Sequence, residues 1–152
     1  MIAFLTRRYR FSASHRLHNA QLSASENARL YGKCNSPYGH GHNYALEVTV
    51  AGPIDPATGM VYDLAALDGA VEREVLEPFD TSYLNLDVEA FQNQVPTTEN
   101  VCIEIFNRLR GQIGQTGQSD PSGKPGNGTS QARLARVRLE ETSSNFFEYE
   151  GG

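Results

Sequence analysis

The chain lacks most of the features that mark secreted, membrane and nucleic-acid-binding proteins. It has two cysteines and no tryptophan, and two cysteines are too few for a disulfide framework. No apolar run approaches the roughly 20 residues that a membrane-spanning helix needs. Its 13 Lys and Arg residues are outnumbered by 18 Asp and Glu residues, whereas nucleic-acid-binding domains are usually basic.

These absences narrow the class of protein. Residues 1–12, MIAFLTRRYRFS, have no long apolar core after their charged residues, so we expect no signal peptide. We predict a cytoplasmic protein with free thiols and with no nucleic-acid or membrane partner. A length of 152 residues fits a single domain, which we place at residues 1–152.

Patterns of apolar residues predict an α+β fold with the order strand, strand, helix, helix, strand, strand. Period-two alternation indicates strands at residues 3–13, 40–51, 133–141 and 145–150. Helical spacing indicates one helix that starts after Asp63 and ends at Pro78, and another that starts at Thr97 or Thr98. Residues 18–39 and 79–96 lack periodicity, and the low complexity of residues 111–131 is typical of a flexible surface loop.

All four histidines lie within the first 42 residues, and three of them match the apolar face of a predicted strand. His15 continues the parity of the first strand, and His40 and His42 share the apolar parity of the second. Side chains at positions i and i+2 of a strand project to the same side. Three neutral imidazoles with one open position suit a catalytic zinc ion. The alternative is a set of ordinary polar histidines in a loop.

The two cysteines have different surroundings. Cys34 lies shortly before His40, and four interpretations of its thiol stay open: metal ligand, general base, nucleophile or buried filler. Cys102 lies on the apolar stripe of a predicted helix, so we interpret it as structural.

Two carboxylates are candidates for chemistry because of where they stand. Asp80 begins the irregular segment after the first helix, and Glu141 continues the strand face that we expect for Ala135, Val137 and Leu139. A carboxylate that faces inwards needs a partner, and the N–H groups of a substrate are one such partner.

Six segments of the chain carry a resemblance to a known family. They are FSASHRLH at 11–18, GKCNSPYGHGHNY at 32–44, IDPATGM at 54–60, LNLD at 84–87, PTTEN at 96–100 and ET at 141–142. Together they resemble the 6-pyruvoyl tetrahydropterin synthases over nearly the whole chain except residues 111–131. The segment before Cys34 is longer than its equivalent in the related 6-carboxytetrahydropterin synthases.

The resemblance implies a fold, an assembly and a reaction. The fold is the tunnelling fold, a four-stranded antiparallel sheet with two helices on one side. The implied assembly is a homohexamer in which three subunits close a β-barrel and two trimers stack. The implied reaction converts 7,8-dihydroneopterin triphosphate, a small pterin substrate, into 6-pyruvoyl tetrahydropterin with loss of triphosphate. It needs zinc but no external redox cofactor, because the side chain is oxidised while the ring is reduced.

The resemblance also implies a role for each matching residue. His15, His40 and His42 match the zinc ligands, and Cys34 matches the general base that moves protons beside the metal. Glu141 matches the carboxylate that binds the pterin N–H groups. Thr97, Thr98 and Glu99 match a segment that shapes the pterin pocket, and Asp80 matches a carboxylate of the catalytic group.

One position departs from the family pattern. The family has Asp-His where this chain has Asp80 and Thr81, and a threonine hydroxyl is no base near neutral pH. Two alternatives to a pyruvoyl tetrahydropterin synthase therefore stay open. One is an enzyme of the same fold with altered chemistry, such as a 6-carboxytetrahydropterin synthase. The other is a protein that binds zinc and a pterin without catalysis.

Overall fold

One sheet of five strands organises the computed structural model, which describes residues 1–114 and 131–152. The order across the sheet is β3-β1-β2-β4-β5. The four long strands are antiparallel to their neighbours: β1 (Ala3–His15), β2 (His40–Gly52), β4 (Arg133–Thr142) and β5 (Asn145–Tyr149). The predicted α+β class and the four predicted strands are confirmed.

The expected count of four strands is wrong by one. β3 (Ser82–Tyr83) pairs in parallel with residues 13 and 14 of β1. A two-residue strand has no apolar alternation to detect, and its pairing is decided by the path of the chain after the first long helix.

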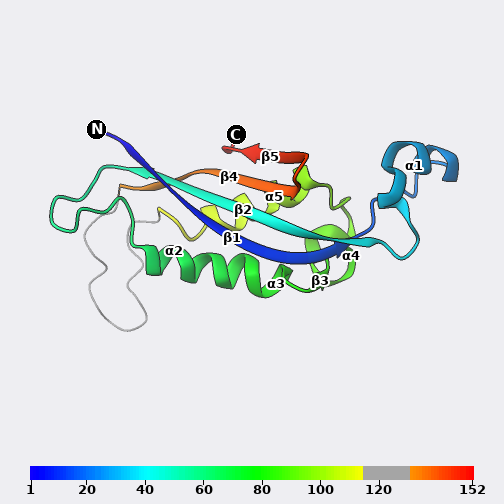
Figure 1. Ribbon diagram of the computed structural model, residues 1–152, viewed down its shortest axis with the longest axis horizontal. Helices are drawn as coiled ribbons and strands as arrows, with labels where there is room; N and C mark the ends of the chain where they lie inside the picture. Colours follow the sequence, from blue (N-terminus) through cyan, green and yellow to red (C-terminus); the bar gives the residue numbers. More distant parts are fainter. Residues whose placement is uncertain (115–130) are drawn as a thin grey trace.

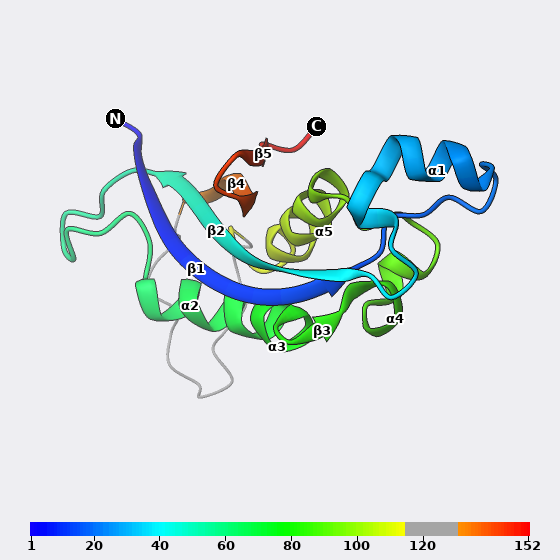
Figure 2. The same cartoon turned by 45° about the vertical axis from the view of Figure 1, so that its right-hand side comes forward.

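Two helical segments cover the same face of the sheet (Figures 1 and 2). One runs without a break through α2 (Leu64–Val71), the π-helical turn η2 (Glu72–Leu76) and α3 (Glu77–Phe79). The other is α5 (Thr98–Arg110). Asp63 is the N-cap of the first, as predicted, and Thr97, one of the two predicted candidates, is the N-cap of the second. The Asp63 side chain accepts two backbone N–H groups of its first turn, and the Thr97 side chain accepts one.

The core forms where these helices meet the sheet. Its members alternate along the strands and recur with helical spacing along α2 and α5, so both patterns meet on one face. The largest fully buried core side chains are Tyr44, Phe79, Leu46, Leu67, Leu84, Ile105, Leu109 and Leu139. No helix within the described residues is both long and apolar enough to cross a membrane.

The first helix continues one residue beyond Pro78, where we expected it to end. Pro78 has no N–H group to donate to the carbonyl of Glu74. The helix widens into the π-turn η2 just before the proline, and Arg108 on α5 donates from Nη1 to the Glu74 carbonyl at 3.4 Å. The guanidinium also lies 5.1 Å from the centre of the Phe79 ring. Arg108 thus ties α5 to the helix end that precedes Asp80.

The segment 18–39, predicted as a loop, contains α1 (Ala24–Tyr31) and the 3₁₀ turn η1 (Gly32–Asn35). α1 stands at one end of the sheet (Figures 1 and 2). Ser23 and Glu26 form a capping box, and the fully buried Asn27 binds the backbone of the preceding turn at residues 19, 22 and 23. Polar contacts stabilise this helix in place of a broad apolar stripe, so the spacing of apolar residues does not reveal it. The Ser-x-x-Glu pattern was the signal that could have revealed it.

Two irregularities in β4 shape its inner face. The pairing with β2 shifts between Thr49 and Val50, so that Ala135 has no partner and Leu134 enters the core. The expectation that Ala135 shares the face of Val137 is therefore wrong, because a β-bulge reverses the alternation.

A second shift, between Glu140 and Thr142, lies in the pairing with β5 and includes Glu141. After α5, Ile113 is buried in the core, so the predicted surface loop does not begin at residue 111. Two short elements, α4 (Leu84–Asp87) and η3 (Glu89–Gln92), occupy the segment before α5. The rest of the predicted loop, residues 115–130, lies outside the described residues.

Candidate metal centre and active site

The three predicted metal-binding histidines lie together at one end of the β1–β2 pair. His15, the last residue of β1, is directly opposite His40, the first residue of β2, and His42 follows on the same face. The Nε2 atoms of His15 and His42 are 3.1 Å apart. The ring centroids of His40 and His42 are separated by 4.5 Å. Strand parity and cross-strand register therefore bring the three imidazoles to one point.

His15 is held in one orientation by the segment before α5. It is fully buried, and its Nδ1 lies 2.9 Å from the carbonyl oxygen of Pro96. Because a carbonyl only accepts, Nδ1 carries the proton and donates, and Nε2 is left with a free lone pair. A backbone acceptor behind a histidine is the usual way to orient a metal ligand. The sequence contains no local signal for this contact, since 81 residues separate the two partners.

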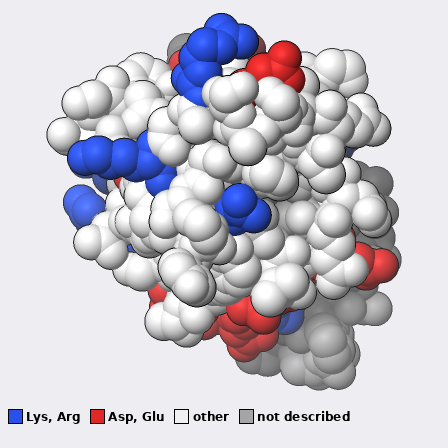
Figure 3. Space-filling model, turned by 90° about the vertical axis from the view of Figure 1, so that its right-hand side faces the viewer, with Lys and Arg blue, Asp and Glu red and all other residues white. Residues whose placement is uncertain are grey.

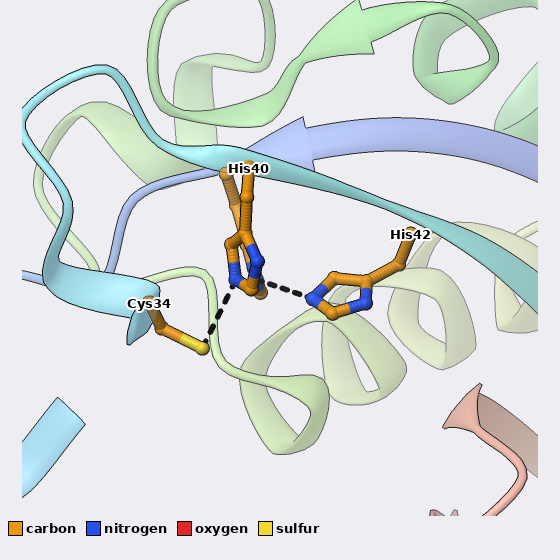
Figure 4. A group of neighbouring side chains, drawn as sticks. Cys34, His40 and His42 are labelled. Atoms are coloured by element: carbon orange, nitrogen blue, oxygen red, sulfur yellow. Dashed lines mark hydrogen bonds between the residues drawn. The ribbon is translucent and has the colours of Figure 1, made fainter. Parts of the chain in front are cut away.

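Cys34 reaches the histidines from the 3₁₀ turn η1 (Figure 4). Its Sγ atom lies 3.1 Å from Nε2 of His40. The carbonyl of Cys34 accepts a hydrogen bond from the backbone N–H of Leu17 at 2.7 Å, which ties η1 to the residues that follow β1. The connection to His40 passes through Gly39, whose φ of +68° favours glycine.

Burial determines the protonation of the free site. It lowers the pKa of His15 and of His42 below the ordinary value for histidine, although the nearby Glu141 carboxylate acts in the opposite direction. Burial raises the pKa of the Cys34 thiol, and the charge of Glu141 raises it further. Burial thus favours neutral imidazoles at His15 and His42, which are the form that binds metal, and a protonated Cys34 thiol that needs a nearby positive charge to ionise.

The side chains present fit a metal ion. One ligand atom from each of His15, Cys34, His40 and His42 lies within 4.8 Å of all the others. Nitrogen and sulfur donors in such a group are typical of zinc. The fourth histidine, His18, is not part of this group, and its Nδ1 accepts from Asn35 Nδ2 at 2.9 Å.

Glu141 enters the same site from β4. Its Oε1 atom lies 3.3 Å from Nε2 of His15 and 3.1 Å from Nε2 of His42. Its other oxygen, Oε2, accepts from Asn145 Nδ2 at 3.2 Å. The inward direction predicted from strand parity is thus observed. The sequence did not identify Asn145 as a site residue, because only the turn between β4 and β5 places it against Glu141.

Asp80 lies beside β1 and, among the described residues, is not part of the group of possible metal ligands. Its Oδ1 accepts from the backbone N–H of Ser12 at 2.9 Å, and the N–H of Thr81 donates to the carbonyl of Ser12 at 2.6 Å. Within the described residues, no hydrogen bond joins Asp80 to Cys34. Thr81 has a φ of +59°, a strained conformation for a β-branched residue. Both residues therefore serve to dock the chain onto β1.

The three residues predicted to shape a pterin pocket lie at the start of α5. Thr97 accepts from Asn100 N at 3.2 Å, Thr98 is buried and Glu99 is exposed. They follow Pro96 directly, so the backbone that orients His15 leads into them.

The described surface at the α1 end of the molecule is mainly uncharged, with a few basic and acidic side chains (Figure 3).

Comparisons with known proteins agree with this arrangement. Residues 4–152 match the family model described as 6-pyruvoyl tetrahydropterin synthase. The chain is 44% identical over 149 residues to the human 6-pyruvoyl tetrahydrobiopterin synthase, covering 98% of this chain and 92% of the relative. It is 43% identical over 150 residues to the Drosophila melanogaster protein of that name, covering 99% and 80%. The solved Caenorhabditis elegans 6-pyruvoyl tetrahydropterin synthase superposes with a TM-score of 0.84 at 41% identity, covering 100% of this chain and 97% of that one.

Proposed function

Because the chain belongs to the 6-pyruvoyl tetrahydropterin synthase family, we propose that it converts 7,8-dihydroneopterin triphosphate into 6-pyruvoyl tetrahydropterin with elimination of triphosphate. Such an enzyme is a carbon–oxygen lyase that acts on phosphates. The observation that carries the proposal is the group of His15, Cys34, His40 and His42, whose ligand atoms lie within 4.8 Å of one another.

We assign the three histidines to a zinc ion. A zinc ion bound there polarises substrate oxygens and makes the neighbouring C–H and O–H protons easier to remove. The Pro96 carbonyl keeps Nε2 of His15 directed into the site, and burial keeps His15 and His42 neutral. The chain's own residues therefore orient one ligand and favour the neutral imidazoles that a cation requires.

We assign Cys34 as the group that moves protons between substrate carbons. Its sulfur is 3.1 Å from a proposed zinc ligand, and a nearby cation offsets the raised pKa of the free thiol. Thr81 stands at the position of the family's histidine, so Cys34 acts without that partner in this chain. A catalytic role for Asp80 stays a prediction, and its carboxylate binds the backbone of Ser12.

We assign the pterin ring to the space beside Glu141 and the start of α5. An ionised carboxylate accepts paired N–H donors such as the 2-amino and ring N–H groups of a pterin. Among the residues that the structure describes, Glu141 is the carboxylate that reaches the histidine group. Thr97, Thr98 and Glu99 follow the backbone that orients His15, which supports a role in shaping the same pocket.

We further propose the homohexamer with barrel-forming trimers. Within the described residues, β1 is paired beyond β2 only at residues 13 and 14, and β5 has one neighbour. Such open edges are suited to pairing with another copy. A single domain over residues 1–152, a cytoplasmic location and the absence of a nucleic-acid partner stay predictions.

Product analysis tests the reaction. Purified, zinc-loaded protein is incubated with 7,8-dihydroneopterin triphosphate, and we expect 6-pyruvoyl tetrahydropterin and free triphosphate. Formation of 6-carboxytetrahydropterin or 6-hydroxymethyl-dihydropterin would assign altered chemistry to the same fold. Tight pterin binding without turnover would reject an enzyme, and recovery of turnover in Thr81→His would then attribute the loss to position 81.

A further inference from the structure

Three atoms in the site form a nearly equilateral triangle. Nε2 of His15 and Nε2 of His42 are 3.1 Å apart, and Oε1 of Glu141 lies 3.3 Å from the first and 3.1 Å from the second. Ligand atoms at about 2.0–2.1 Å from a tetrahedral zinc ion are separated by about 3.3–3.4 Å. The spacing of these three atoms is therefore close to that of three ligands on one face of a tetrahedron.

The surroundings of Glu141 call for a cation. Its side chain is only 13% exposed, and among the described residues no lysine or arginine pairs with it. A carboxylate in such a place needs a positive charge or several hydrogen-bond donors. Among the described residues, the one side chain outside the histidine group that donates to it is Asn145, which binds Oε2.

We propose that Glu141 is itself a metal ligand in the substrate-free protein and leaves the metal when a pterin binds. The inference rests on the proposed metal site and deepens it, because it gives one carboxylate two successive partners. Oε1 joins the histidine nitrogens while the pocket is empty. When a pterin ring offers its paired N–H groups, the carboxylate turns to them, and its place at the metal becomes available to substrate oxygens.

A short chain of hydrogen bonds positions Glu141 for this exchange. Asn145 donates to Oε2 of Glu141, and its own Oδ1 accepts from Thr142 Oγ1 at 2.6 Å. Glu141 also lies in the irregular pairing between Glu140 and Thr142, and bulges commonly redirect a side chain at a functional site. Asn145 is thus a positioning residue that leaves Oε1 free to reach the metal.

Cobalt binding tests the proposal without turnover. The metal-free wild-type protein and the Glu141→Gln, Glu140→Gln and Asn145→Ala variants are titrated with Co²⁺, whose visible absorption reports its ligands. Zinc affinity is then measured by competition. We expect Glu141→Gln to weaken metal binding about 10–100-fold and to change the cobalt spectrum. Glu140 is the preceding carboxylate on β4 and, within the described residues, forms none of the short contacts to histidine nitrogens that Glu141 makes, so its variant serves as the matched control and should bind as the wild type does.

The variant Asn145→Ala keeps the carboxylate and loses only its support. We expect a smaller loss of affinity than in Glu141→Gln, together with a broadened or shifted cobalt spectrum. It also covers the case in which Glu141→Gln folds poorly, since Asn145 is exposed and its removal leaves the core unchanged.

Unsubstituted pterin, which has the ring and no side-chain oxygens, tests the exchange. Its addition to the cobalt-loaded wild type should change the visible spectrum, because the carboxylate leaves the metal for the ring. The spectrum of Glu141→Gln should not respond. Equal cobalt affinity and spectrum in wild type and Glu141→Gln would overturn the proposal. That result would leave the proposed reaction intact, since turnover of the wild-type enzyme is measured separately.

Discussion

Gly39 occupies a position where one added methyl group tests how closely the two histidine-bearing strands approach. A Cβ atom at residue 39 would lie 2.6 Å from the carbonyl oxygen of His15 and 3.1 Å from its carbonyl carbon. Contacts of this kind below 3.0 Å essentially never occur. Because both neighbours are backbone atoms at a proposed metal ligand, the change Gly39→Ala must move the ends of β1 and β2 apart.

Gly59 is a matched control for the cost of placing alanine at a positive φ. Gly59 has a φ of +72° and nothing within 4 Å of its Cβ position, whereas Gly39 has a φ of +68° and the close contact. Alanine at a positive φ costs about 1–2 kcal/mol, and the loss of unfolded-state freedom is similar at both sites. Overpacking adds about 1–3 kcal/mol. We therefore expect Gly59→Ala to lose about 1 kcal/mol and Gly39→Ala about 2–4 kcal/mol.

Urea unfolding of the metal-free protein, at one fixed subunit concentration, measures both losses. A zinc titration by competition then measures the metal site. We expect Gly39→Ala to bind zinc at least about tenfold more weakly, as for other changes that disturb the support of a ligand, and Gly59→Ala to bind it normally. If the two variants lose equal stability and keep equal zinc affinity, the close approach of Gly39 to His15 is refuted.

The remaining predictions concern the two cysteines. The change Cys34→Ala should reduce turnover about 10²–10⁴-fold, the usual contribution of a general base, while zinc stays bound; full activity would remove Cys34 from the mechanism. Burial raises the pKa of the Cys102 thiol to about 12, so the folded state holds this proton more tightly than the unfolded state above pH about 8.5. The contribution of this thiol to the free energy of unfolding is therefore fully present below that pH. It is lost as the pH rises towards 12, by up to about 1.4 kcal/mol per pH unit. Between pH 8 and pH 10, the free energy of unfolding measured in urea should fall less in Cys102→Ala than in the wild type. An equal fall would contradict the raised pKa of Cys102.

Local sequence patterns were sufficient for the parts of the fold that repeat with a period. Alternation along the strands predicted that His15, His40 and His42 face the core side, and capping residues predicted where α2 and α5 begin. These features depend on neighbours within one element, so a single sequence contains them.

Features that depend on polar contacts or on short pairing were missed. The helix α1 is held by its capping box and by the buried Asn27 and not by an apolar stripe. The strand β3 exists because Asp80 and Thr81 bind the backbone of Ser12. The bulge at Ala135 places Leu134 in the core instead of Ala135. None of these has a periodic signature.

The sequence by itself determined which histidines are candidate metal ligands, because residue type and strand parity specify the donors and the face on which they lie. Only the tertiary structure decided how those donors are held. The Pro96 carbonyl behind His15, the 3.1 Å approach of Cys34 to His40 and the placement of Glu141 between two imidazoles join segments distant in the chain. Such contacts arise from the packing of α5 and β4 against β1 and β2, which no pattern within one segment can express.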